Sequence, residues 1–236
     1  MNDEDQVLIS PRYMAGTGPV QDAIGPLIHL FDWPWIHDST TGRITATSPD
    51  QTTTVDFDPS ERFGRWWAVT HRGEQDRRAE FTRHTPAETV AAVTLSLPQL
   101  LGDRRHIEPL NVGVDPFAVT SNSGWRQDSN GHATSSDGHC TLWHTPGSAW
   151  AWWVEADVYG KAGTQWDAAF STHAPTALVT RFVTRLTTPE PVQRRYGSIP
   201  GPAVPFALIT PVCIPLGNAQ LAHALGQLGA AARRHR

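Results

Sequence analysis

The stretch that decides the fold is Phe81-Thr82-Arg83-His84-Thr85-Pro86, where a strand pattern gives way to a helix pattern. A second version follows downstream as Phe170-Ser171-Thr172-His173-Ala174-Pro175, with Phe, His and Pro in the same places. The recurrence of one strand-to-helix junction indicates an internal duplication, in which each copy is one supersecondary unit. We therefore predict two diverged copies of one β-rich unit.

Earlier landmarks recur in the same order. The segment Trp35-Ile36-His37-Asp38-Ser39 returns as Trp125-Arg126-Gln127-Asp128-Ser129, and each leads to a glycine. Further pairs follow, and the drift in their spacing is what small insertions and deletions in hairpin loops produce. These pairs are Thr47-Ser48-Pro49-Asp50 with Thr134-Ser135-Ser136-Asp137, and Trp66-Trp67 with Trp152-Trp153.

Each copy reads as four strands. The segments are rich in Thr, Val and Trp, alternate with a period of two, and are separated by Pro, Gly and Asp residues typical of turns. The expected strands are residues 43–48, 52–58, 65–72 and 77–82 in the first copy, and 132–135, 139–144, 150–159 and 165–171 in the second.

A helix closes each copy. Thr85, Pro86 and Glu88 fit the N-cap, the first helical position and the glutamate of a capping box. Pro175 keeps the helix start in the second copy, and apolar residues follow at helical spacing in both. Shorter helices are expected near residues 20–31 and 116–121.

Strand alternation assigns faces to the paired tryptophans. Trp152 falls on the apolar side of its strand and should pack under the helix. By the repeat, Trp66 should be buried too. Trp67 and Trp153 would then point to the opposite sheet face, with Trp143 nearby.

The predicted fold class is α+β, with two tandem ββββα repeats, antiparallel sheets each backed by a helix, and a pseudo-two-fold axis. Residues 1–105 form the first repeat with an N-terminal strand and a short helix, and residues 106–190 form the second. Residues 191–236 form a Pro-rich arm, uncharged from Tyr196 to Ala232, with a short C-terminal helix and a basic end. Such an arm should dock in extended form on its own core or on another subunit.

Composition narrows the class of protein. A formal net charge of −4 lacks the strongly basic footprint of a duplex-DNA binder. The most apolar stretch, residues 203–216, contains three prolines and is too short to span a bilayer. The N-terminus is acidic and polar, unlike a secretory signal, and Cys140 and Cys213 do not make a disulfide framework. We expect a cytoplasmic protein with reduced thiols and no membrane association.

Two stretches and the duplication carry a family resemblance: Val7-Leu8-Ile9-Ser10-Pro11-Arg12-Tyr13, and Thr47-Ser48-Pro49-Asp50. They resemble the SPDY-type domain of streptomycete and related actinomycete proteins, over residues 7 to about 200. The sequence departs from the pattern at Gln51, where the family name implies tyrosine, and at Ser136, opposite Pro49. The family is defined without a known function, so the resemblance implies a duplication and no activity.

Catalytic and metal chemistry find little support. No Gly-rich phosphate loop or nucleophile elbow is present, so we expect no enzyme, no catalytic residue and no cofactor. The densest group of potential ligands contains His139, Cys140 and His144, weak candidates for zinc. A cysteine in mid-strand is more often a core residue, and we favour that interpretation.

Two binding hypotheses remain. Tandem ββββα units resemble PUR-repeat and Whirly-like proteins, which bind single-stranded nucleic acid on a sheet face. Here tryptophans would stack on bases and arginines would contact phosphates, although Glu155, Asp157 and Asp167 would repel a phosphate backbone. The candidate residues are Trp67, Trp143, Trp153, Arg65, Arg72, Arg77 and Arg78.

The rival hypothesis is a protein-interaction or scaffold module. Such a module would self-associate, for example as a homodimer, through the aromatic sheet face or the C-terminal arm. The tryptophans would then be contact residues for a protein partner, or core residues.

Overall fold

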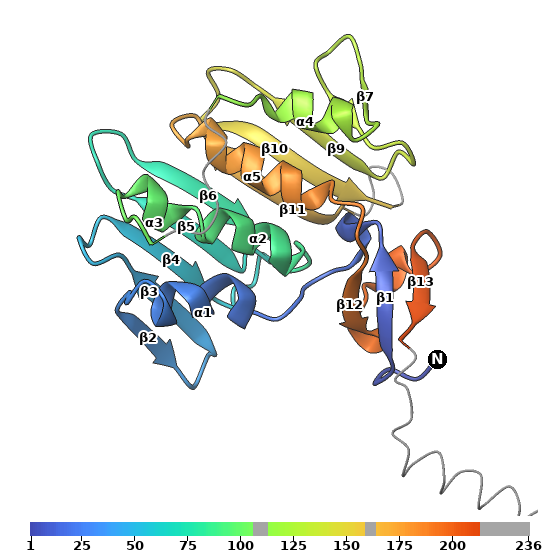
Figure 1. The fold of residues 1–236 in the computed structure, drawn as a ribbon, viewed down its shortest axis with the longest axis horizontal. Coiled ribbons are helices and arrows are strands. Elements are labelled where there is room, and N and C mark those ends of the chain that lie inside the picture. The colour runs from blue at the N-terminus through green and yellow to red at the C-terminus, as the bar shows by residue number, and fades with distance from the viewer. Residues whose placement is uncertain (106–112, 159–163, 213–236) are drawn as a thin grey trace, which may run out of the picture.

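A computed structural model describes residues 1–105, 113–158 and 164–212 of the chain. Two sheets and a row of helices make up this part (Figure 1). The first repeat comprises α1 (Gln21–His29), β2 (Trp35–Asp38), β3 (Arg43–Thr47), β4 (Thr53–Phe57), β5 (Trp67–His71), β6 (Arg77–Phe81), α2 (Ala87–Thr94) and α3 (Leu97–Leu100). The second comprises α4 (Pro116–Asn122), β7 (Arg126–Gln127), β8 (Ala133–Thr134), β9 (Cys140–His144), β10 (Trp150–Asp157), β11 (Thr164–Ser171) and α5 (Thr176–Leu186).

The strands of both repeats form one ten-stranded antiparallel sheet, in the order β2-β3-β4-β5-β6-β11-β10-β9-β8-β7. The repeats meet where β6 pairs with β11, and we call this pairing the seam. Its register joins Ala79 to Phe170, Glu80 to Ala169 and Phe81 to Ala168. This register is symmetric about the pair of Glu80 with Ala169, so a pseudo-two-fold axis passes through the seam. The two predicted sheets are therefore halves of one.

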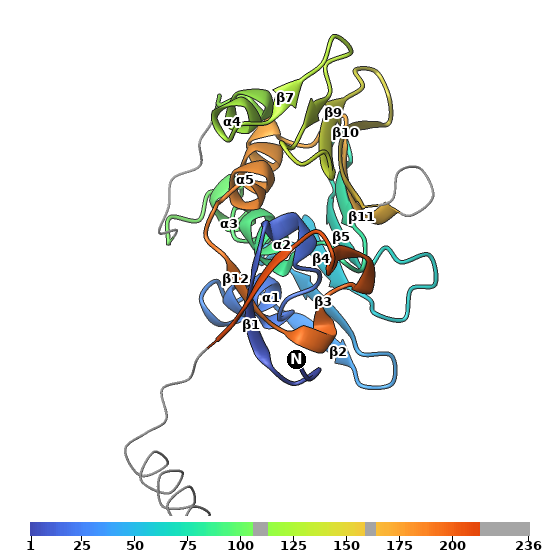
Figure 2. The same ribbon diagram turned by 90° about the vertical axis from the view of Figure 1, so that its right-hand side faces the viewer.

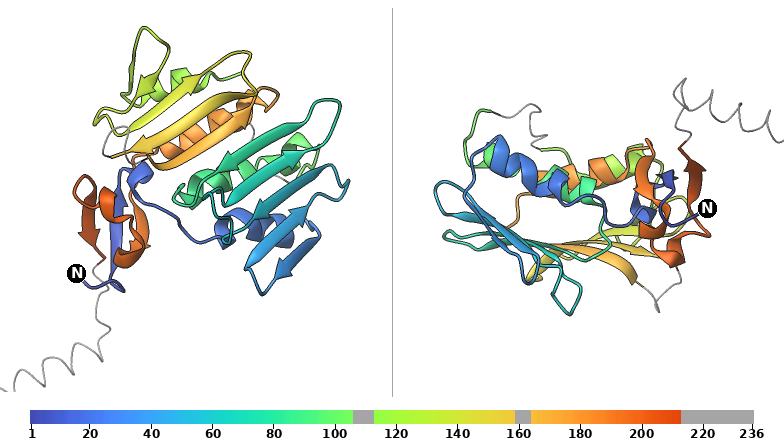
Figure 3. Two further views of the ribbon diagram at one scale, coloured as in Figure 1. Left: turned by 180° about the vertical axis from the view of Figure 1, so that it is seen from behind. Right: turned by 90° about the horizontal axis from the view of Figure 1, so that it is seen from below.

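Helices α1, α2, α5 and α4 lie side by side on one face of this sheet, with α2 against α5 at the seam (Figures 1 and 2). No helix of the described residues lies on the other face, which Figure 3 (left) presents to the viewer. We call it the helix-free face.

Aromatic side chains fill the space between the seam and the helices. Phe182 of α5 stacks on Phe81 and contacts Phe170 and Trp166 edge-on, with ring centroids 5.6, 5.7 and 6.2 Å away. All four side chains are essentially buried. Both repeats contribute to this cluster, so they share one core.

A smaller three-stranded sheet stands beside the helices, in the order β12-β1-β13. It joins β1 (Gln6–Ser10) to β12 (Val192–Arg195) and β13 (Leu208–Pro211), so both ends of the described chain meet there. Short 3-10 turns flank these strands: η1 (Arg12–Met14), η2 (Tyr196–Ser198) and η3 (Gly201–Ala203). The predicted C-terminal helix, the basic end and Cys213 lie outside the described residues.

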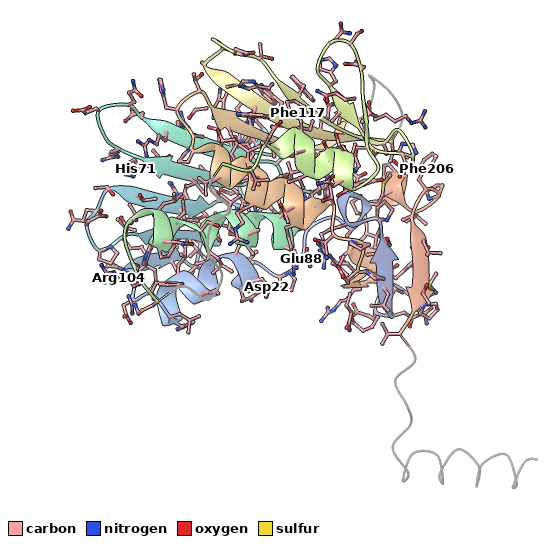
Figure 4. The ribbon with its side chains drawn as sticks, turned by 45° about the horizontal axis from the view of Figure 1, so that its top comes forward. Asp22, His71, Glu88, Arg104, Phe117 and Phe206 are labelled. Atoms are coloured by element: carbon pink, nitrogen blue, oxygen red, sulfur yellow. The ribbon has the colours of Figure 1, made fainter. Side chains whose placement is uncertain are left out.

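The predicted capping box of the first repeat does not form. Both carboxylate oxygens of Glu88 accept hydrogen bonds from the Arg194 guanidinium, at 2.8 and 2.7 Å. Burial raises the Glu88 pKa, but the bonds from Arg194 outweigh it, so the net shift is downward. An ion pair to β12 therefore replaces a local cap, and it fastens the small sheet to α2 near Asp22 (Figure 4).

Each repeat has five strands where the sequence predicted four. The eight predicted strands are present, and β2 and β7 are the additions at the two sheet edges. Every residue of β2 and β7 is exposed, so neither carries the apolar alternation that marks a half-buried strand.

The face predicted for Trp67 is wrong. Trp67 pairs with Phe81 as Trp152 pairs with Phe170, so the counterpart of Trp152 is Trp67 and not Trp66. Trp67 is 1% exposed on the helix side. A shift of one residue in the repeat alignment placed Trp67 on the wrong face, and Trp66, predicted to be buried, is half-buried against the core.

The buried position of Trp67 predicts a large stability effect. Trp67→Ala should lower the free energy of unfolding by about 3–5 kcal/mol, because it removes a buried ring and leaves a cavity. Trp35, 51% exposed on the edge strand β2, is the matched control, and Trp35→Ala should change stability by less than about 0.5 kcal/mol. Urea unfolding measures both. Equal, small losses would contradict the assignment of Trp67 to the core.

Candidate binding surface on the helix-free sheet face

Three half-buried tryptophans of the second repeat gather on the helix-free face. The rings of Trp143 and Trp153 are nearly parallel, with centroids 6.1 Å apart and planes at 5°. Trp150 lies edge-on to Trp153 at 6.4 Å, and its carbonyl accepts a hydrogen bond from the Trp153 indole N–H at 3.2 Å. We call these three residues the tryptophan cluster.

Local strand geometry puts the cluster together. Trp143 and Trp153 are paired across β9 and β10, so their side chains share a face. A β-bulge between Trp150 and Trp152 changes the alternation of β10 and places Trp150 opposite Ser171. Trp150 therefore joins Trp153 on the helix-free face, whereas Trp152 lies among the buried residues.

Two arginines of the first repeat reach the tryptophan cluster across the seam. The guanidinium carbon of Arg65, which precedes β5, lies 5.9 Å from the Trp153 ring centroid, and that of Arg78 on β6 lies 5.9 Å from Trp150. Both distances fall within the range of cation–π attraction. The surface is thus composite, with rings from one repeat and cations from the other.

Carboxylates already engage both arginines. Arg78 bonds Glu80 at 2.7 Å. Arg65 lies 3.3 Å from Glu80 and 3.4 Å from Asp167, ion pairs whose geometry falls short of a hydrogen bond. Burial raises the Asp167 pKa; Arg65 lowers it, while Glu155 and Glu80 add to the rise. Burial is the largest of these effects, so the net rise in the Asp167 pKa comes mainly from the partly buried position of the carboxyl.

An acidic hollow adjoins the tryptophan cluster. Its volume is about 350 Å³. Glu155 and Asp157 follow Trp153 along the same face of β10, and Thr141 lies two residues from Trp143 on β9. The lining residues are Gly138, His139, Thr141, Glu155, Asp157 and Val158.

The half of this face that belongs to the first repeat is different. Arg43 and Asp56 form a bidentate ion pair at 2.9 and 2.8 Å, and Thr45 donates to the same carboxylate at 2.6 Å. Thr54 and Thr70 continue the surface. This ion pair and these threonines contain no aromatic ring, whereas the seam combines stacked rings with cations, so the composite region at the seam is the candidate site.

The structure separates the predicted site residues into two groups. Arg65, Arg78, Trp143 and Trp153 converge at the seam. The other three do not join them: Trp67 is buried on the helix side, Arg77 lines a cavity on that side, and Arg72 is exposed after β5.

Sequence reasoning missed Trp150 and Glu80. The β-bulge that turns Trp150 outward has no signature in the sequence. The alternation of Arg78 and Glu80 along β6 was a usable signal, because residues two apart share a face of a strand.

The weak metal candidates do not assemble. Cys140 is fully buried, and burial raises the pKa of its thiol. His139 lies on the opposite face, near the Asp157 carbonyl at 3.3 Å, and His144 stacks on Trp152 at 4.1 Å. Within the described ranges no three potential ligands gather as a metal site. In the same part of the chain, no helix is long and apolar enough to cross a bilayer.

Residues 47–99 and 134–192 each match the family model described as SPDY, a domain of unknown function (DUF317). The matches run from the end of β3 into α3 and from the end of β8 to the start of β12, which are corresponding parts of the two repeats. The chain thus contains the SPDY domain twice. No curated protein and no solved structure matched the chain.

The raised pKa of Asp167 predicts a pH-dependent stability effect. A carboxyl whose pKa is higher in the folded state binds more protons there than in the unfolded state. Its contribution to the free energy of unfolding therefore falls as pH rises above about 4. Asp167→Asn should therefore raise the melting temperature at pH 7, and the gain should vanish near pH 4. The exposed hairpin variant Asp76→Asn is the control. A lower melting temperature for Asp167→Asn at pH 7 would show instead that the ion pair with Arg65 dominates.

Proposed function

We propose that the tandem SPDY unit is a non-enzymatic binding module whose helix-free face binds a cationic segment of a partner protein. The observation that carries the proposal is the acidic hollow beside the stacked rings of Trp143 and Trp153. Aromatic faces attract cations, and neighbouring carboxylates add to that attraction. An arginine or lysine side chain fits both features.

The state of the two arginines supports this preference over nucleic acid. Glu80 engages both Arg65 and Arg78, and Asp167 shares Arg65. Phosphate contacts would require these guanidinium groups to exchange carboxylates for phosphates, beside Glu155. The carboxylates of the face outnumber its arginines, so a polyanion would be repelled.

Single-stranded nucleic acid is the second candidate. The parallel rings of Trp143 and Trp153 are suited to stacking on bases, and a tandem sheet backed by helices resembles the PUR and Whirly arrangement. Self-association through the same face is the remaining form of the protein-interaction hypothesis.

Fluorescence anisotropy with a labelled deca-arginine peptide tests the proposal. We expect saturable binding that weakens with salt. Trp153→Ala should reduce the binding free energy of the peptide by about 1 kcal/mol, or about fivefold in affinity, because the cation–π contact is lost. Trp35→Ala, which removes an exposed tryptophan at the far edge of the sheet, should leave the affinity unchanged.

A labelled single-stranded oligonucleotide and the Glu80→Gln variant separate the two candidates. Loss of the Glu80 charge should weaken binding of the peptide and strengthen binding of the oligonucleotide, because it releases Arg65 and Arg78. If the wild-type protein binds the oligonucleotide more tightly than the peptide, the cationic-partner proposal fails. Light scattering of the same samples reports any self-association.

A further inference from the structure

The pseudo-two-fold axis relates paired strand positions of one repeat to positions of the other. Thr53 and Cys140 open β4 and β9, and Asp50 and Asp137 precede them by the same interval. Arg77 and Trp166 likewise stand two residues before Ala79 and Ala168, which flank the axis.

The turns before β4 and β9 share one set of hydrogen bonds. The Ser48 hydroxyl donates to Asp50 and accepts from the Thr53 N–H, as the Ser135 hydroxyl donates to Asp137 and accepts from the Cys140 N–H. The residue after each aspartate, Gln51 or Gly138, has a positive φ, of 62° and 82°. The equivalence therefore extends to individual atoms.

In the second repeat this end of the sheet holds Tyr13. The ring is 6% exposed, its hydroxyl donates to Asp137 at 2.6 Å, and its carbonyl accepts the Trp166 indole N–H at 2.8 Å. The segment then passes the start of α2, where the Thr17 hydroxyl donates to the Arg83 carbonyl. The chain's own N-terminal segment thus covers the space between the sheet, Trp166 and α2.

The equivalent space in the first repeat is a cavity of about 170 Å³. Its walls come from the sheet, from α3 and from the start of α5, the counterpart of α2; His71 on the sheet wall is labelled in Figure 4. Where the second repeat has Trp166, the first has the exposed Arg77 at the cavity lining. The lining residues include Val69, His71, Ala79, Leu97, Leu101 and Leu178.

We propose that this cavity binds the side chain of a tyrosine from a protein partner, in the manner in which the second repeat holds Tyr13. An apolar cavity of about 150 Å³ accepts one benzene ring, so the volume fits a single side chain. The leucine walls suit the ring, and Thr53 and His71, hydrogen-bonded at 2.9 Å, supply a polar wall for the hydroxyl. Asp50, the counterpart of the Asp137 that accepts the Tyr13 hydroxyl, lies in the turn just before Thr53.

The site lies on the helix side of the sheet, so this proposal is independent of the function proposed for the helix-free face. Failure of deca-arginine to bind would leave it intact, and its own failure would leave the helix-free face unaffected.

Titration of the full chain with p-cresol, the side-chain analogue of tyrosine, tests the proposal by NMR of the leucine and valine methyl groups. We expect saturable shifts at Val69, Leu97, Leu101 and Leu178, with a Kd of about 1 mM. Ala79→Leu should weaken binding at least about tenfold, because the added atoms occupy the cavity.

Ala68→Leu is the matched control, since it makes the same change on the adjoining strand but on the helix-free face. It should leave the p-cresol affinity unchanged. Should Ala79→Leu fail to fold, Leu178→Phe fills the cavity from α5 and makes the same test. The absence of shifts at these methyl groups up to about 20 mM p-cresol would overturn the proposal, as would undiminished binding by the folded cavity-filling variant.

Discussion

The pairing of β6 with β11 is the constraint on which the rest of the structure depends. Its register aligns Glu80 with Ala169 and turns two five-stranded repeats into one sheet. Because the sheet is continuous, α2 and α5 are brought side by side over it, and Phe182 packs between aromatic residues of both repeats. Neither repeat could bury this aromatic cluster alone.

The same pairing makes the helix-free face a joint product of the two repeats. The row across the seam runs from Ala68 through Glu80 and Ala169 to Trp153. Small side chains flank Glu80 there, and Arg65 extends over the row to both Asp167 and Trp153. Charges from one half thus meet rings from the other, which explains how two diverged copies can form a surface that neither has by itself.

The divergence of the copies also follows from the fold. Trp166 and Tyr13 close one end of the second repeat, whereas the corresponding end of the first retains a cavity under α3. The segment around Tyr13 packs on this end of the second repeat and not on the corresponding end of the first. The two repeats therefore differ at this end of the sheet.

Much of the fold was predictable because it depends on local signals. Alternating Thr and Val residues and turn residues located eight strands, and Pro86 and Pro175 located the starts of α2 and α5. The exposed edge strands carry no such pattern, and two adjacent tryptophans fit either register, which is why Trp67 was assigned to the wrong face. The candidate site was recoverable only in part: its tryptophans and arginines could be named, but their convergence and their carboxylate partners depend on the seam, a contact between residues distant in sequence.

An NMR titration of the full chain with deca-arginine tests most directly the claim that the binding surface is composite. The account predicts that the indole signals of Trp150 and Trp153 and the backbone signals around Arg78 and Ala169 shift together, with one Kd. Shifts confined to one repeat, or to the helix side of the sheet, would contradict it.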